Sequence, residues 1–260
     1  MDRGTGGANE SADGRFLPRA LAARLFKRRY SVYVPADFDA SRVRPVVLFL
    51  HGSGERGRDG LRPTAVGLGE AIRRSPERFP AVVVFPQARP REYWSGAAAG
   101  YALAALERTI QEFRGDPERI YGVGLSMGGY GILRMAGESP DRFAAVVAVC
   151  GGILPPPSVR VRRGQAPAEA DPYAAAADRI RGVPVRLYHG ADDPMVPCEE
   201  SRRLARALKE RGGNVLYTEY PKTGHDSWTP AFEDPELWRW LFAQRRHRRA
   251  AGRAPSDLQI

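Results

Sequence analysis

The stretch Arg119-Ile-Tyr-Gly-Val-Gly-Leu-Ser-Met-Gly-Gly129 decides the fold of this 260-residue chain. Residues 119–123 predict a buried strand, and residues 127–137 predict the helix that follows it. Between them lies Gly124-Leu-Ser-Met-Gly128, a G-x-S-x-G pattern that also occurs by chance in glycine-rich loops. Between a strand and a helix, however, it is typical of a sharp turn whose glycines avoid Cβ clashes and whose serine projects above the sheet. The sequence therefore predicts that Ser126 is presented as a nucleophile.

Apolar runs along the rest of the chain predict strands and helices in alternation. Further strands are expected at residues 30–34, 45–50, 81–85, 143–149, 183–188 and 215–220, and further helices at 101–113, 199–210 and 235–242. Such alternation produces a mostly parallel sheet with helices on both faces, joined by right-handed crossovers. We therefore expect an α/β fold.

The length of the chain suits one such domain with shorter segments at either end. Residues 1–28 have no sustained period and are expected to form a loose leader before an α/β domain at 29–244. Residues 245–260 are expected to be a basic, flexible tail. Residues 154–178 are rich in Pro, Ala and Arg and are expected to be an irregular insert, either a small cap or a mobile loop. The sequence thus predicts little or no cap.

Composition excludes several classes of protein. The 40 Lys+Arg and 30 Asp+Glu residues give a net charge of +10, but the arginines are dispersed, so we expect no specific nucleic-acid binding. No apolar run approaches the roughly 18 residues of a membrane helix, and no secretory signal is visible at the N-terminus. Two cysteines, Cys150 and Cys198, are too few for a disulfide framework or a Cys-based zinc site. We expect a cytoplasmic protein without metal or cofactor, and its oligomeric state is open.

A serine nucleophile needs a base, and the sequence has four histidines. His51 and His189 each end a predicted strand and precede a glycine, which suits a ring that orders a loop by hydrogen bonding. His247 lies in the basic tail and is expected to be solvated. His225, in Lys-Thr-Gly-His-Asp after the last strand, is expected to act as the base for Ser126.

The base in turn needs a carboxylate that fixes its tautomer. Asp192 and Asp193 follow the strand predicted at 183–188. We favour Asp193, because Pro194 turns the chain directly after it, and we expect Asp192 to cap the loop or the next helix. Asp226, next to the base, is expected to be solvated or to hydrogen-bond its own loop.

Two donors are needed for the oxyanion that forms on an attacked carbonyl group. The backbone N–H of Met127, at the start of the predicted helix, is one candidate. The second is expected from the loop His51-Gly-Ser-Gly-Glu-Arg-Gly57, where we assign the N–H of Ser53, with Gly52 as the alternative. A phosphate cradle is the competing interpretation of this loop, but the loop lacks the Gly-Lys-Ser/Thr ending of a P-loop.

Four motifs together resemble the α/β-hydrolase serine esterases. They are Leu48-Phe-Leu-His-Gly-Ser-Gly-Glu-Arg-Gly57, Gly124-Leu-Ser-Met-Gly-Gly129, His189-Gly-Ala-Asp-Asp-Pro-Met-Val-Pro197 and Gly224-His-Asp-Ser-Trp228. The resemblance covers about residues 30–242. It is to the phospholipase/carboxylesterase and dienelactone-hydrolase-like branch, near polyhydroxybutyrate-depolymerase-like, feruloyl-esterase-like and predicted-peptidase proteins.

The order Ser, Asp, His along the chain is also that of this group, and it differs from the order in chymotrypsin and subtilisin. The resemblance implies an α/β-hydrolase fold in which Ser126 is the nucleophile, Asp193 the acid and His225 the base. It also implies oxyanion amides near Ser53 and Met127.

The motifs say little about the substrate. Tyr93, Trp94 and Trp228 lie on predicted loops near the catalytic strand ends and are candidates for substrate-binding residues, although packing over the core is an equal alternative. We expect hydrolysis of small-molecule carboxylic esters through an acyl-enzyme intermediate at an open site. The alternatives are a serine peptidase of the prolyl-oligopeptidase-like type, with the same triad, and a non-catalytic binding protein on the same scaffold.

Overall fold

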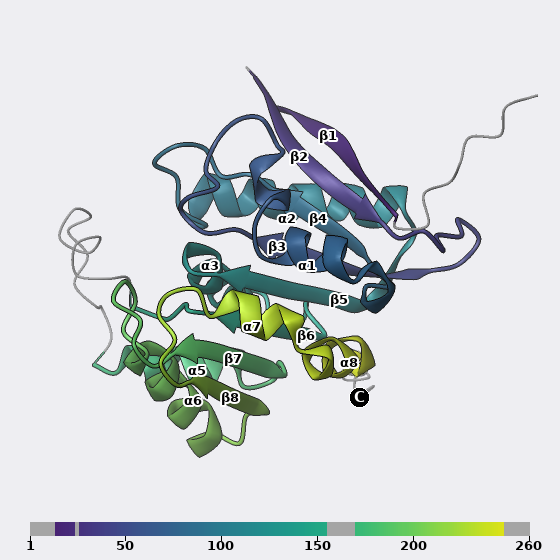
Figure 1. Ribbon diagram of the computed structural model, residues 1–260. Coiled ribbons are helices and arrows are strands. Elements are labelled where there is room, and N and C mark those ends of the chain that lie inside the picture. The colour runs from purple at the N-terminus through teal and green to yellow at the C-terminus, as the bar shows by residue number, and fades with distance from the viewer. Residues whose placement is uncertain (1–13, 24–25, 155–169, 247–260) are drawn as a thin grey trace, which may run out of the picture.

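An eight-stranded sheet forms the centre of the computed structural model, which describes residues 14–23, 26–154 and 170–246 (Figure 1). The strands lie side by side in the order β1-β2-β4-β3-β5-β6-β7-β8. Neighbours from β4 to β8 run parallel, while β1 and β2 are antiparallel to their neighbours. The strands are β1 (Arg15–Ala23), β2 (Phe26–Val34), β3 (Arg44–Leu50), β4 (Val82–Pro86), β5 (Gly115–Leu125), β6 (Ala145–Val149), β7 (Val185–Gly190) and β8 (Val215–Tyr220).

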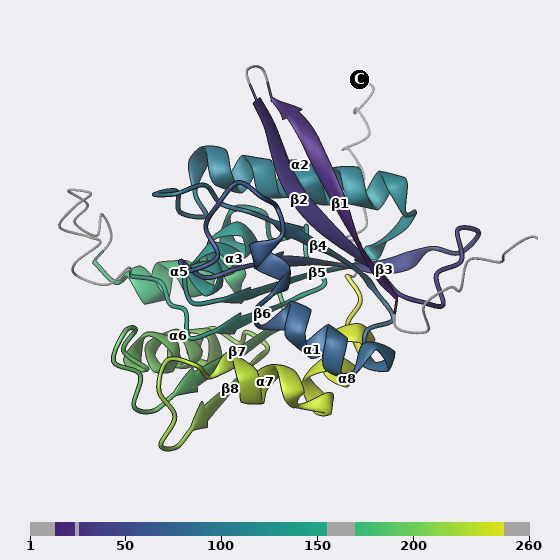
Figure 2. The ribbon, with the colours of Figure 1, turned by 45° about the horizontal axis from the view of Figure 1, so that its top comes forward.

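Helices cover both faces of the sheet (Figures 1 and 2). One face carries α2 (Gly96–Glu112), α3 (Met127–Glu138), α5 (Pro172–Ile180) and α6 (Glu199–Glu210). The other carries α1 (Leu68–Arg74), α7 (Trp228–Glu233) and α8 (Pro235–Ala243). Two 3-10 turns, η1 (Arg62–Thr64) and η2 (Pro76–Arg78), flank α1. In the part of the chain that is described, none of these helices has the length and apolarity needed to cross a lipid bilayer.

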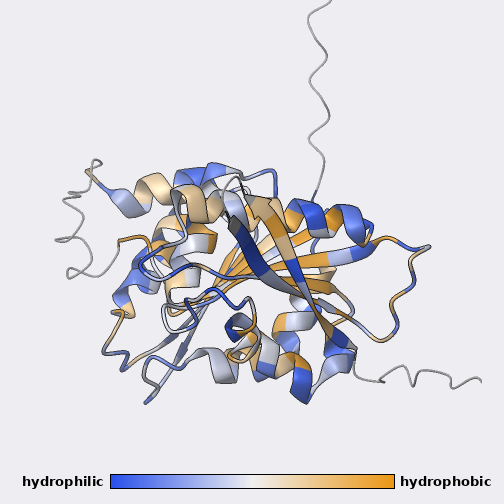
Figure 3. Cartoon of the chain, turned by 90° about the horizontal axis from the view of Figure 1, so that it is seen from above, coloured by the Kyte–Doolittle hydropathy of each residue, from blue (hydrophilic) through white to orange (hydrophobic). Residues whose placement is uncertain are grey.

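The hydrophobic core consists of two layers, one on each side of the sheet. Side chains alternate along a strand, so Val46, Leu48 and Leu50 of β3 join one layer, whereas Val47 and Phe49 join the other. All five are at most 1% exposed. This two-sided burial explains the continuous apolar runs in the central strands, which are orange in the middle of Figure 3.

The N-terminal segment differs from the sequence prediction. The loose leader expected over residues 1–28 is wrong from Arg15 onward, because β1 pairs with β2 as an antiparallel hairpin at one edge of the sheet. The ring of Phe16 lies 5.2 Å from that of Tyr33. Pro18 is tolerated in β1 because an edge strand has one side without a ladder partner. Arg and Ala residues hide the alternating pattern, and residues 1–13 lie outside the described part.

The insert and the tail also differ from the prediction. Residues 154–178 were expected to be irregular, but α5 begins at Pro172, and Asp171 caps it by accepting hydrogen bonds from the Tyr173 and Ala174 amides. Residues 155–169 lie outside the described part. At the start of the tail, the Arg246 N–H donates to the Glu118 carbonyl oxygen at 2.8 Å, and Arg245 lies 3.6 Å from the Glu118 carboxylate. Residues 245 and 246 therefore pack against the domain. Residues 247–260, with His247, are not described.

Candidate active site

Ser126 occupies a strained turn between β5 and α3. Its φ of 51° and ψ of −118° lie outside the regions that non-glycine residues usually adopt, and such conformations cost about 1–3 kcal/mol each. Two glycines permit the turn: a Cβ on Gly124 would lie 2.2 Å from the Gly128 oxygen, and a Cβ on Gly128 would lie 1.8 Å from the Leu50 oxygen. The G-x-S-x-G spacing thus follows from the close approach of α3 to the ends of β3 and β5.

The structure brings Ser126, His225 and Asp193 together, although they lie far apart in the chain. His225 follows β8, and its Nε2 lies 2.9 Å from Ser126 Oγ. Its Nδ1 lies 2.7 Å from Asp193 Oδ2. Because an ionised carboxylate only accepts hydrogen bonds, Nδ1 carries the proton in this pair, and Nε2 is left to accept one from the Ser126 hydroxyl group. The imidazole is 22% exposed, whereas the Asp193 side chain is completely buried.

The Asp193 carboxylate accepts hydrogen bonds on both oxygens. Its Oδ1 accepts from the backbone N–H groups of Met195 at 2.8 Å and Val196 at 2.9 Å. Its Oδ2 lies 3.3 Å from His189 Nε2, in addition to the contact with His225. Burial alone would raise the pKa of Asp193, but the hydrogen bonds from the two histidines and the two amides outweigh it and lower the pKa. Asp193 is therefore ionised at neutral pH.

The other two candidate carboxylates lie apart from this contact. Asp192 is exposed, and its backbone N–H donates to the Thr223 oxygen at 3.0 Å. Asp226 Oδ1 accepts from the Thr229 N–H at 3.1 Å, within the first turn of α7. Asp226 therefore bonds its own loop and helix, as the sequence analysis expected.

His51 orders the loop after β3, as its position at a strand end predicted. It is 1% exposed, its Nδ1 lies 2.5 Å from the Gly52 oxygen, and its Nε2 accepts from the Ala88 N–H at 3.0 Å. Burial lowers the pKa of His51 to about 4, so the ring is neutral.

His189 also orders a loop, but it has a second contact that sequence reasoning missed. Its Nε2 lies 3.0 Å from the Val196 oxygen, and the same atom approaches Asp193. The spacing of four residues between His189 and Asp193, across a tight turn, is the signal in the sequence that could have indicated this contact.

The two candidate oxyanion donors come from segments next to Ser126. Met127 is the first residue of α3, where backbone N–H groups have no acceptor within the helix. Gly52 lies beside Ser126, since a Cβ built on it would be 3.6 Å from the Ser126 Cβ. Ser53 is the next residue and is exposed. The residue beside Ser126 is thus Gly52, the alternative to Ser53 as the second predicted oxyanion donor.

The two tryptophans considered as substrate-binding residues differ in their surroundings. Trp94 is 2% exposed, its Nε1 donates to the His51 oxygen at 3.0 Å, and it packs against α3 at Gly131. This corrects the expectation for Trp94, whose side chain is part of the core. Trp228 is half-buried, and its ring lies edge-on to that of His225 with centroids 5.6 Å apart. The Arg56 guanidinium group lies over the Tyr93 ring, with its central carbon 4.6 Å from the ring centroid.

Within the residues that the structure describes, no group of three or more His, Cys, Asp or Glu side chains is arranged to hold a metal ion. Cys150 is buried and Cys198 is partly buried, and both are free thiols.

Comparison with known proteins agrees with this geometry. Residues 26–246 match the family described as "Putative esterase". The chain belongs to this esterase family. A crystal structure of a thermostable esterase is 31% identical, with a TM-score of 0.72, over 89% of this chain and 63% of that one. The esterase resemblance and the α/β-hydrolase fold predicted from the sequence are thereby confirmed.

Two further proteins extend the comparison with this esterase. The protein described as "Putative esterase NocK", from Nocardia uniformis subsp. tsuyamanensis, is 30% identical over 161 residues, or 60% of this chain. The match spans only 42% of the length of NocK. The S-formylglutathione hydrolase of Agrobacterium tumefaciens has a TM-score of 0.69 over 91% of this chain and 97% of its own, but at 18% identity it shows only the shared fold.

Proposed function

We propose that this esterase is a serine hydrolase that cleaves carboxylic esters through Ser126, His225 and Asp193. The observation that carries the proposal is the continuous line of contacts from Ser126 Oγ through the imidazole to the Asp193 carboxylate, at 2.9 Å and 2.7 Å. Each contact is within the distance at which a base can take the proton of a nucleophile and a carboxylate can orient that base. Membership of the esterase family supports an ester as the substrate.

In the first half of the proposed reaction, Ser126 Oγ attacks the ester carbonyl carbon while His225 Nε2 takes the hydroxyl proton. The buried negative charge of Asp193 stabilises the imidazolium that forms. The carbonyl oxygen becomes an oxyanion, for which the N–H of Met127 and an N–H from the Gly52–Ser53 segment are the proposed donors. His225 then gives its proton to the departing alkoxide, which leaves as an alcohol and leaves the acyl group on Ser126.

In the second half, a water molecule replaces the alcohol. His225 takes a proton from the water as its oxygen attacks the acyl-enzyme carbonyl group, and the same amides hold the second oxyanion. The tetrahedral intermediate collapses, Ser126 recovers its proton from His225, and the carboxylic acid is released. The proposed substrate is a small-molecule ester.

The test is covalent labelling of the protein with a fluorophosphonate probe, together with turnover of a short-chain p-nitrophenyl ester. Ser126→Ala is expected to abolish labelling and to lower kcat by about 10⁴-fold or more, by analogy with other triads. Ser139→Ala, at the other end of α3, is the matched control and is expected to retain both. Full turnover by Ser126→Ala would exclude Ser126 as the nucleophile.

A matched pair of ester and amide substrates separates an esterase from a peptidase. The same three residues can attack either carbonyl group, so the residues alone do not distinguish the two activities. We expect the ester to be hydrolysed much faster, and faster cleavage of the amide would support the peptidase alternative instead. Absence of labelling in the wild-type protein would support the non-catalytic alternative.

A further inference from the structure

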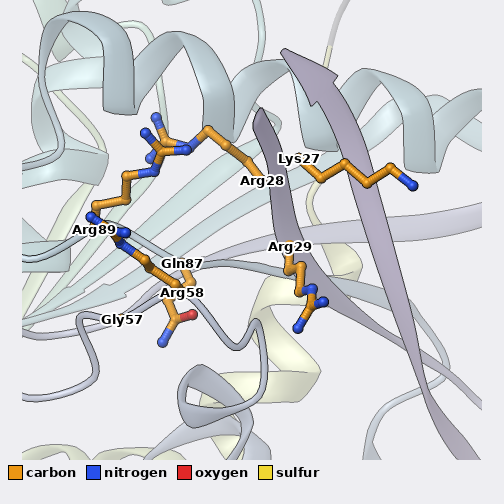
Figure 4. Close-up of a pocket in the computed structure, with 7 residues that line it drawn as sticks. All are labelled: Lys27, Arg28, Arg29, Gly57, Arg58, Gln87 and Arg89. Atoms are coloured by element: carbon orange, nitrogen blue, oxygen red, sulfur yellow. The ribbon is translucent and has the colours of Figure 1, made fainter. Parts of the chain in front are cut away.

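A strongly basic pocket lies outside the proposed catalytic residues (Figure 4). It has a volume of about 240 Å³ and lies between β2, the loop after β3 and the loop after β4. Its lining residues are Lys27, Arg28, Arg29, Gly57, Arg58, Gln87 and Arg89. Five of these seven carry a positive charge and none carries a negative charge. Such a concentration of charge favours an anionic occupant.

Part of this positive charge is neutralised nearby. Arg28 pairs with Glu92 at 2.5 Å, and its guanidinium group lies 4.0 Å from the centre of the Tyr101 ring. Even so, the buried Nε of Arg28 has no hydrogen-bond partner among the described residues. Over the same residues, no ion pair forms at Lys27, Arg29 or Arg58. These three residues therefore give the lining an excess of positive charge.

Hydrogen bonds fix the walls of the pocket. Gln87, which is 3% exposed, accepts from the Gly60 N–H at 2.7 Å and donates to the Glu55 oxygen at 2.9 Å. A Cβ on Gly57 would lie 2.4 Å from the Gln87 Nε2, so glycine is needed for this close approach. On the opposite wall, the Tyr101 hydroxyl group donates to the Arg29 backbone oxygen at 2.6 Å. The pocket is thus preorganised, which lowers the entropic cost of binding.

The loop after β3 joins this pocket to the proposed active site. Gly57 lines the pocket and Gly52 lies beside Ser126, and five residues of extended chain span at most about 18 Å. Arg56, between them, approaches the Met127 sulfur atom at 2.9 Å through Nη2 and donates to the Glu92 backbone oxygen at 2.8 Å through Nε. The two places are therefore no farther apart than the length of an extended small molecule.

We propose that this pocket binds a phosphate group. Guanidinium groups pair with phosphate through two parallel hydrogen bonds, and Arg28, Arg58 and Arg89 extend toward one another from three segments in Figure 4. A phosphate dianion matches the excess of cations better than a single carboxylate does. The phosphate belongs either to an ester substrate that extends to Ser126 or to a separate phosphorylated ligand. Only the first source rests on the proposed function.

Isothermal titration calorimetry with inorganic phosphate tests the binding itself. At about 0.15 M salt, where the Debye length is about 8 Å, we expect saturable binding of one phosphate. Arg58→Gln and Arg89→Gln are each expected to weaken it about tenfold, since each removes one of the converging charged hydrogen-bond donors. Arg206→Gln is the control, because Arg206 is exposed on α6, at the opposite end of the sheet, and its loss changes the net charge equally.

Three results would overturn the proposal. One is the absence of saturable binding at this salt concentration, and another is equal weakening by Arg206→Gln, which would indicate general charge attraction. The third is retention of a single-stranded oligonucleotide with the same dependence on Arg58, which would assign the surface to nucleic acid. If the protein bound phosphate through Arg58 but did not react with the fluorophosphonate probe, the phosphate pocket would be supported and the proposed function would be contradicted.

The source of the phosphate is determined with two p-nitrophenyl esters that differ only in a terminal phosphate on the acyl chain. If the phosphate belongs to the substrate, kcat/KM is higher for the phosphorylated ester, and Arg58→Gln removes this preference. Inorganic phosphate then also inhibits its hydrolysis competitively. If a separate ligand binds, the two esters are hydrolysed equally well while phosphate still binds. Either result supports phosphate binding in the pocket, and the comparison of the two esters shows whether the phosphate belongs to the substrate or to a separate ligand.

Discussion

His189 Nε2 lies 3.3 Å from Asp193 Oδ2, the carboxylate oxygen that also contacts His225 Nδ1 at 2.7 Å. His189 is completely buried, and its Nδ1 lies 2.7 Å from Ser201 Oγ. Because Nε2 approaches two oxygens, those of Asp193 and Val196, this atom carries the proton, and Nδ1 accepts from the Ser201 hydroxyl group. Asp193 thus contacts two histidines, and the buried His189 helps to hold the orientation of its carboxylate.

Replacing His189 should impair the orientation of the Asp193 carboxylate and should leave the binding of substrate unchanged. For His189→Gln we expect kcat for a short-chain ester to fall by about 10- to 100-fold with little change in KM, because small displacements of catalytic groups have effects of this size. Steady-state kinetics measure both constants.

Ser201→Ala is the matched control for His189→Gln. It removes the hydroxyl group behind the ring and leaves the contact with Asp193, so a smaller decrease in kcat is expected. If a folded His189→Gln protein kept the wild-type kcat, His189 would have only a packing role.

The lowered pKa of Asp193 predicts a dependence of stability on pH. The unfolded chain binds this proton more readily than the folded protein, so ionised Asp193 stabilises the fold above the usual carboxyl pKa. We expect this contribution to be lost progressively as the pH falls from about 5. Urea unfolding at a series of pH values measures it, and Asp193→Asn should lack this part of the decrease.

Asp192→Asn serves as the control for the pH experiment, because it removes an adjacent carboxylate that is exposed. It should keep the acid-dependent loss of stability seen in the wild-type protein. If Asp193→Asn and wild type lost stability in parallel below pH 5, the hydrogen bonds to Asp193 would not stabilise its ionised form.

The sequence indicated those parts of the candidate site that depend on contacts between residues close together in the chain or on the order of the strands and helices. The glycines around Ser126 are required by clashes within a few residues, so their spacing is visible in the sequence. Asp193 and His225 follow predicted strands, and the carboxyl ends of parallel strands meet at one edge of a sheet. Their position at the same edge of the sheet could therefore be predicted from the element order alone.

Other features depend on contacts that no local pattern specifies. Trp94 is buried because Gly131 of α3 leaves space for it, since a Cβ on Gly131 would lie 2.4 Å from the Trp94 Cβ. The basic pocket combines residues near 28, 58 and 88, and these meet only because β2, β4 and β3 are neighbours in that order. Neither the pairing of an edge hairpin nor the order of strands is determined by hydrophobic periodicity.

Glu200 connects two segments of the fold, and its removal should destabilise the protein. Its Oε2 accepts from the N–H groups of Ile153 at 2.9 Å and Leu154 at 3.0 Å, and its Oε1 accepts from the Tyr173 hydroxyl group at 2.7 Å. Glu200→Ala leaves these three donors without their acceptor at a position that is 8% exposed. We expect a loss of about 2–4 kcal/mol in the free energy of unfolding, measured with urea.

The neighbouring Glu199 provides the control for Glu200. It is exposed and lies 3.6 Å from Arg202 in a surface ion pair. Such pairs contribute at most about 1 kcal/mol, so Glu199→Ala should have a small effect. Equal losses in the two variants would mean that the hydrogen bonds of Glu200 do not stabilise this part of the fold.

The position of α3 against β3 is tested by adding one methyl group at Gly128. A Cβ there would lie 1.8 Å from the Leu50 oxygen and 2.9 Å from the His51 oxygen, and neither backbone atom can move without displacing the loop beside Ser126. For Gly128→Ala we expect a loss of about 3 kcal/mol or more in unfolding free energy and weaker fluorophosphonate labelling. Gly100→Ala makes the same change in α2, where no heavy atom lies within 4 Å, and should stabilise the protein by about 0.5–1 kcal/mol. Similar stabilities of the two variants would contradict the close approach of α3 to the end of β3, and with it the reason why glycine is needed two residues after Ser126.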